Sequence, residues 1–201
     1  MVEPESKSPN RKDFLNMAFW FEGSMVGVAW LIGWFVDVNP FANLSISGPA
    51  FIWGFVGTIP LFLLFLLFYR FPVGPLYPIK RNLLEILGPV LSLCSWYELA
   101  ILAVVAGVSE EILFRGVLQP WLETIAGPSG GLTLSNVIFG LLHWLTPMYA
   151  LIAGLIGFYL AYSMDITGTR YLVTPIVIHT LYDFLAFIIV AEAYRLHRDR
   201  T

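Results

Sequence analysis

The chain has 201 residues, of which 58% are hydrophobic and only 12% are charged, whereas about a quarter of the residues in soluble domains are charged. With a mean hydropathy of +0.76, this composition excludes an ordinary soluble surface and predicts a polytopic helical membrane protein. The net charge of -3 and the lack of a basic tract argue against a nucleic-acid partner. Cys94 is the only cysteine, which excludes an internal disulfide and a multi-cysteine zinc site.

The chain reads as a series of apolar helices joined by short polar or proline-rich loops, and about 20 apolar residues suffice to cross the hydrocarbon layer. Six helices are clear, at 15–36, 51–69, 96–121, 132–145, 149–164 and 171–191, and a seventh at 83–94 is doubtful. We expect one all-α transmembrane domain of six to seven membrane helices. Polar tails are expected at 1–13 and 192–201, and the chemistry-bearing helices at 96–191.

The positive charges predict the orientation in the membrane. Three cations precede the first helix and three follow the second, namely Lys7, Arg11 and Lys12, then Arg70, Lys80 and Arg81. The positive-inside rule places both groups on the cytoplasmic side. If 83–94 crosses, the polar residues described below lie toward the cytoplasm and the C-terminus lies outside; if it does not, the C-terminus is inside and the site opens outward. We favour the crossing arrangement.

Ionisable residues inside the apolar helices are the informative ones, because each costs about 2.5 to 3.5 kcal/mol at the bilayer centre and so needs a partner, a cavity or a function. They are Glu110, Glu111 and Arg115 in one helix, His143 in the next, and His179 and Asp183 in the last. Another carboxylate, Glu22, lies near the start of the first helix and is expected at the interface or facing a pore.

Helical spacing separates the two adjacent glutamates. Glu111 and Arg115 are four residues apart, so they share a helix face and can form an ion pair. Glu110 points about 100° away and lacks that partner, which suits it to act as a general base. His179 and Asp183 also share a face. Asn136, near the same face as His143, is expected to form a hydrogen bond between helices.

Depth arithmetic shows that these residues can meet. At about 1.5 Å per residue, Glu110, His143 and His179 lie about 17, 17 and 12 Å from the same membrane face. A glutamate and two histidines from separate helices form a constellation that can activate water for hydrolysis.

Three motifs in order resemble the CAAX-protease and bacteriocin-processing (CPBP, or Abi) family of intramembrane proteases, which includes the type II CAAX prenyl endopeptidases. They are Glu-Glu-x-x-x-Arg at Glu110, Glu111 and Arg115, Phe-x-x-x-His at Phe139 and His143, and His-x-x-x-Asn/Asp at His179 and Asp183. The resemblance covers about 96–191, and the first 95 residues match only as generic membrane helices. It implies an endopeptidase of the cell (inner) membrane acting on a membrane-associated protein or peptide.

The resemblance also implies roles for individual residues. Glu110 would deprotonate the attacking water, and His143 would hold or polarise that water. His179 and Asp183 would face the oxyanion or complete a metal site, whereas Glu111 and Arg115 would be structural. Because an ionised Asp can only accept hydrogen bonds, Asp183 is expected to be protonated, to orient His179 or to bind a cation.

Metal dependence stays open at this point. Glu110, His143 and His179 have the chemistry of a catalytic zinc set with an open fourth position. A metal-free glutamate and histidine mechanism needs the same residues, and we give the two equal weight.

Two other functions deserve comparison. The segment Gly127-Pro128-Ser129-Gly130 matches the GxSG of rhomboid serine proteases, with Ser129 as nucleophile and His179 as its base, but this leaves Glu110, Arg115 and His143 unexplained. Intramembrane carboxylates and histidines also occur in ion or proton pathways, and a family scaffold can persist without activity. A non-catalytic membrane scaffold is therefore the second alternative.

Overall fold

The computed structural model describes residues 10–198, and this part of the chain is all-helical, which confirms the predicted fold class. The α-helices are α1 (Arg11–Val36), α2 (Gly48–Arg70), α3 (Leu76–Asn82), α4 (Gly88–Leu91), α5 (Trp96–Glu111), α6 (Gln119–Leu142), α7 (Pro147–Ser163) and α8 (Val173–Arg198). Two π-helical stretches, η1 (Leu83–Leu87) and η2 (Ile112–Leu118), join α3 to α4 and α5 to α6.

Local signals in the sequence account for most helix ends. The Asn10 side chain caps α1 by accepting a hydrogen bond from the Lys12 backbone N–H, and a capping box of Ser95 and Glu98 begins α5. At Gly127 the backbone leaves the helical conformation (φ 73°, ψ 170°). A positive φ favours glycine and the next residue, Pro128, has no N–H to donate, so the predicted loop is a sharp kink within α6.

The predicted polar tails fall partly outside the described residues. Residues 1–9 of the expected N-terminal tail lie outside them, and residues 11–13 already belong to α1. At the other end the helix α8 continues to Arg198, so the described part of the expected tail at 192–201 is helical. Residues 199–201 lie outside the described part.

Within residues 10–198, three helices are long and apolar enough to cross a membrane: α1, α2 and α8. A fourth span results if 76–91 and 96–142, which meet at a bend of 119°, are counted together. The helix α7 has 17 residues and is shorter than these spans. The long apolar helices make the chain an integral membrane protein.

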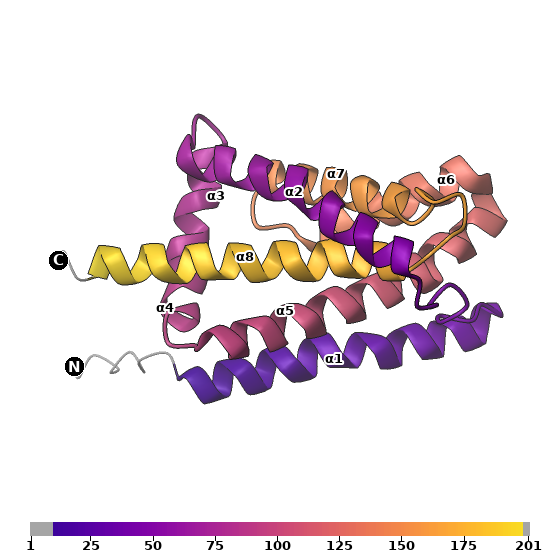
Figure 1. Ribbon diagram of the computed structural model, residues 1–201, viewed down its shortest axis with the longest axis horizontal. Coiled ribbons are helices and arrows are strands. Elements are labelled where there is room, and N and C mark those ends of the chain that lie inside the picture. Colours follow the sequence, from indigo (N-terminus) through magenta and orange to yellow (C-terminus); the bar gives the residue numbers. More distant parts are fainter. Residues whose placement is uncertain (1–9, 199–201) are drawn as a thin grey trace, which may run out of the picture.

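The segment α3–η1–α4 lies across one end of the bundle and does not cross it, so the expectation that 83–94 forms a span is wrong. Figure 1 shows this segment at the end where α1 begins and α8 ends. The Arg195 guanidinium, near the end of α8, donates to the carbonyl oxygens of Ser92 (2.9 Å) and Cys94 (3.0 Å). The sharp bend before α5, which begins at Trp96, turns the chain back into the bundle.

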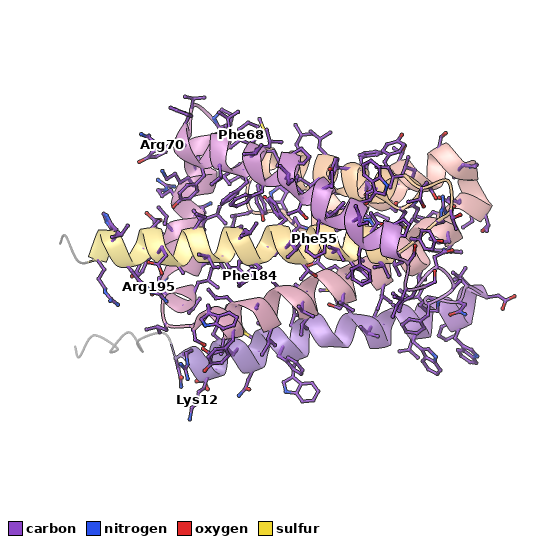
Figure 2. The ribbon with its side chains drawn as sticks, in the orientation of Figure 1. Lys12, Phe55, Phe68, Arg70, Phe184 and Arg195 are labelled. Atoms are coloured by element: carbon purple, nitrogen blue, oxygen red, sulfur yellow. The ribbon has the colours of Figure 1, made fainter. Side chains whose placement is uncertain are left out.

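Cations gather at this same end of the molecule. Figure 2 shows Lys12, Arg70 and Arg195 at the end where α1 begins and α8 ends. The positive-inside rule predicts that this basic end faces the cytoplasm.

The close contact between α5 and α8 sets the relative depth of their polar residues. Gly107 lies against Thr180, and a Cβ atom at position 107 would come within 2.5 Å of the Thr180 hydroxyl oxygen. Only glycine allows this approach, and it brings the residues just after Gly107 level with His179 and Asp183.

Candidate active site

Three polar side chains from different helices meet inside the bundle, as the depth arithmetic predicts. The Oε2 atom of Glu110, on α5, lies 3.7 Å from His143 Nε2 at the end of α6 and 3.9 Å from His179 Nε2 on α8. The side chains of Glu110 and His179 are 10% and 9% exposed, and that of His143 is 29% exposed. The structure thus brings together the residues of all three motifs.

Arg115 connects the elements around this site through buried polar contacts. Its Nη1 atom lies 3.0 Å from Glu111 Oε1, and both side chains are almost completely buried. Its Nη2 atom donates to Asn136 Oδ1 (3.1 Å) and to the Gly157 carbonyl oxygen (2.8 Å). The predicted ion pair and the interhelical role of Asn136 are both present, and Arg115 links η2 to α6 and α7.

Glu111 has a second contact, which the sequence did not predict. Its Oε1 atom accepts a hydrogen bond from His179 Nδ1 at 2.8 Å. Because an ionised carboxylate only accepts, the proton of this bond resides on Nδ1, and the ring presents Nε2 to Glu110. Glu111 therefore orients His179 as well as pairing with Arg115.

The Phe-x-x-x-His motif holds the other imidazole. His143 Nδ1 lies 2.8 Å from the Phe139 carbonyl oxygen, which can only accept, so Nδ1 carries the proton and Nε2 presents its lone pair to Glu110. The Phe139 ring packs against the His143 ring at 4.3 Å between centroids and against His179 at 6.3 Å. The buried Phe139 thus restricts both imidazoles.

Asp183 faces His179, which supports the orienting role among the three considered. Its Oδ2 atom lies 3.5 Å from His179 Nε2. Carboxylates of Asp183 and Glu110 both face this nitrogen, and two nearby negative charges favour a proton on it. His179 can therefore donate a hydrogen bond from Nε2.

Glu110 carries a buried oxygen that lacks a hydrogen bond. Its Oε2 atom is buried and has no hydrogen-bond partner among the described residues. A buried acceptor left without a donor costs about 1 to 3 kcal/mol. This oxygen is therefore the natural binding position for a water molecule or a substrate N–H group.

Two cavities lead to the site past η1. One, of about 140 Å³, is almost entirely apolar and reaches Asp183. The other, of about 280 Å³, reaches His143. Leu83, Leu87 and Tyr149 border both cavities. Because η1 lies at the basic end of the bundle, both cavities approach the site from that end. Tyr149, which borders both cavities, could not be identified as a site residue from the sequence.

The polar side chains of the site have the chemistry of a zinc set. Two imidazole nitrogens and a carboxylate are ligands that zinc accepts. Within residues 10–198, however, no group of three or more His, Cys, Asp or Glu side chains is gathered so that it could hold a metal ion. His179 Nε2 is instead directed at carboxylates, an arrangement that suits an N–H donor better than a ligand.

The serine required by the rhomboid alternative lies elsewhere. Ser129 is exposed at the kink of α6, whereas His179 is buried and its ring nitrogens face Glu110, Glu111 and Asp183. The geometry therefore provides no Ser129 and His179 pair.

Comparison with known proteins gives one match. Residues 92–185 match the model of the Rce1-like type II CAAX prenyl endopeptidase family. No curated protein and no solved structure matches the chain. The matched region contains Glu110, His143, His179 and Asp183 and excludes α1 to α4. Over residues 92–185, nearly half of its length, the chain is thus similar to the Rce1-like type II CAAX prenyl endopeptidase family, a family of membrane proteases.

Proposed function

We propose that this protein is an intramembrane endopeptidase in which Glu110 activates water to hydrolyse a peptide bond of a membrane-associated substrate. One observation carries the proposal: the unpaired Oε2 atom of Glu110 lies within 4 Å of the Nε2 atoms of both His143 and His179. These three residues lie in the region matched by a protease family.

In the proposed reaction, a water molecule donates hydrogen bonds to Glu110 Oε2 and His143 Nε2. Glu110 takes a proton from this water as its oxygen bonds to the scissile carbonyl carbon. The Nε2–H group of His179 stabilises the resulting oxyanion. Glu110 then returns the proton to the amide nitrogen as the C–N bond breaks, which yields a carboxylic acid and an amine, and the acid passes its proton to the amine or to water. Asp183 and Glu111 position His179 throughout.

The walls of the apolar cavity suggest the kind of substrate. Leucine, isoleucine and phenylalanine side chains line most of the cavity that reaches Asp183, and Lys80 also borders it. An apolar lining suits a hydrocarbon chain, and the matched family is named for prenyl substrates. We therefore propose a peptide with a prenylated cysteine, admitted past η1 from the cytoplasmic side.

Cleavage of a defined probe tests this proposal. Purified protein in phospholipid vesicles should cleave a fluorogenic farnesylated CAAX peptide, and should cleave the same peptide without farnesyl at least about tenfold more slowly because the hydrocarbon contact is lost. Ser129→Ala should behave as wild type. An inactive Ser129→Ala protein would favour a serine protease, and equal cleavage of both peptides would contradict the prenyl specificity.

Chelation tests the metal question. A divalent cation would supply a Lewis acid and lower the pKa of its bound water, but the proposed reaction does not require one. Cleavage after treatment with EDTA or 1,10-phenanthroline should therefore stay within about twofold of the untreated rate, since the acid and base groups are already present. Loss of activity that added zinc restores would overturn the metal-free mechanism.

A further inference from the structure

Glu22 is a carboxylate in the middle of α1, outside the region that matches the protease family. Its Oε2 atom is buried and has no hydrogen-bond partner among the described residues. A carboxylate inside a membrane helix is costly and usually marks a function. The sequence suggested an interfacial or pore-facing position for this residue, and the structure places it more specifically.

The register between α1 and α5 sets the depth of Glu22. The two helices start at the same end and run side by side (Figure 1). Arg11 Nη1 lies 3.6 Å from Glu98 Oε2. Counting eleven residues onward along each helix places Glu22 level with Ser109, one residue from Glu110.

Packing further along α1 supports this register. Met25 and Val26 pack against the core cluster that contains Ile112 and Leu113. Met25 and Val26 lie three and four residues after Glu22, and Ile112 and Leu113 lie three and four residues after Ser109. The alignment of the two helices therefore continues past the site.

The Glu22 carboxylate lies near the candidate active site. It lies close enough to Glu110, His179 and Asp183 to interact with each of them electrostatically. The residues of the site belong to α5, α6 and α8, so Glu22 adds a side chain from a fourth helix, α1. Besides Oε2 of Glu111, the described part of the site then contains two further buried carboxylate oxygens without donors, Oε2 of Glu110 and Oε2 of Glu22.

We propose that Glu22 is a positioning residue for the attacking water, an inference that rests on the proposed function. Oε2 of Glu22 accepts a hydrogen bond from a second water molecule, which satisfies an otherwise unpaired buried acceptor, and this second water donates its other hydrogen to the attacking water beside Glu110. An attacking water that also accepts this hydrogen bond has fewer orientations, so its remaining lone pair is directed more often at the substrate carbonyl. The proton itself still passes to Glu110.

Substitutions at position 22 test this role with the same farnesylated peptide. Glu22→Gln keeps an oxygen that accepts a hydrogen bond, so kcat should stay within about threefold of wild type. Glu22→Leu and Glu22→Ala remove the acceptor and should lower kcat roughly 10- to 100-fold with KM nearly unchanged. The control is Ser24→Ala, because Ser24 is exposed on the same helix and bonds only to the Phe21 carbonyl oxygen; it should match wild type.

The outcomes separate this inference from the proposed function. If Glu22→Leu and Glu22→Ala cleave as wild type while Glu110→Gln is inactive, the role of Glu22 is overturned and the hydrolytic function stands. Equal losses in the Gln and Ala variants would also overturn the hydrogen-bond role. Cleavage by Glu110→Gln at the wild-type rate would remove the proposed function itself. If Glu22→Leu does not fold, the comparison of Glu22→Gln with Glu22→Ala still tests the hydrogen-bond role of Glu22.

Discussion

Glu110→Gln should lower kcat for peptide hydrolysis by roughly 10²- to 10⁴-fold, the usual contribution of a general base. Glutamine has nearly the same size and still accepts a hydrogen bond, but it cannot take the proton of the attacking water. The Oε2 atom of Glu110 has no hydrogen-bond partner among the described residues, so the substitution breaks no existing hydrogen bond of that atom. Initial rates with the farnesylated peptide in vesicles measure the effect.

A matched substitution shows whether the loss is specific. Glu192 lies near the end of α8, where its exposed side chain pairs with Arg195. Glu192→Gln makes the same chemical change far from the site and should retain the wild-type rate. The thermal midpoint of Glu110→Gln should lie within a few degrees of wild type. A fully active Glu110→Gln protein would contradict the assignment of the base. Inactive wild-type protein that still binds a partner would favour the scaffold alternative.

Arg115→Met should reduce the free energy of unfolding by about 3 to 5 kcal/mol, the typical cost of leaving one member of a buried ion pair uncompensated. The Arg115 side chain is 1% exposed and that of Glu111 is 0% exposed. The substitution also removes the donors to Asn136 and to the Gly157 carbonyl oxygen. Unfolding in mixed micelles with increasing SDS measures the loss.

Two further variants show whether the loss of stability comes from breaking the buried ion pair or from the removal of an arginine in general. Arg81 and Glu85 form an exposed pair on α3 and η1, with 3.9 Å between nitrogen and oxygen, and Arg81→Met should cost less than about 1 kcal/mol. The double variant Glu111→Gln with Arg115→Met should recover part of the loss, because no unpaired charge then remains buried. A cost below about 1 kcal/mol for Arg115→Met would contradict the structural role of the pair.

The sequence by itself determined the features that depend on neighbouring residues. Apolar runs long enough to cross a bilayer established the all-helical membrane class, because hydrocarbon requires each spanning segment to satisfy its own backbone. The spacing of Glu111 and Arg115 placed both on one helix face. The kink at Gly127 follows from the conformational freedom of glycine and the missing N–H of Pro128. Depth arithmetic was sufficient to predict that Glu110, His143 and His179 could converge.

Contacts between distant segments depended on the tertiary structure. Whether 83–94 crosses was decided by the bend before α5 and by the anchoring of this segment to Arg195 at the end of α8. The bond from His179 to Glu111 depends on how closely α8 packs against α5, and the place of Glu22 beside the site depends on the register of α1. Helical periodicity specifies which face a side chain occupies, but not which helix packs against that face or at what height. Those relations arise only when the helices pack together.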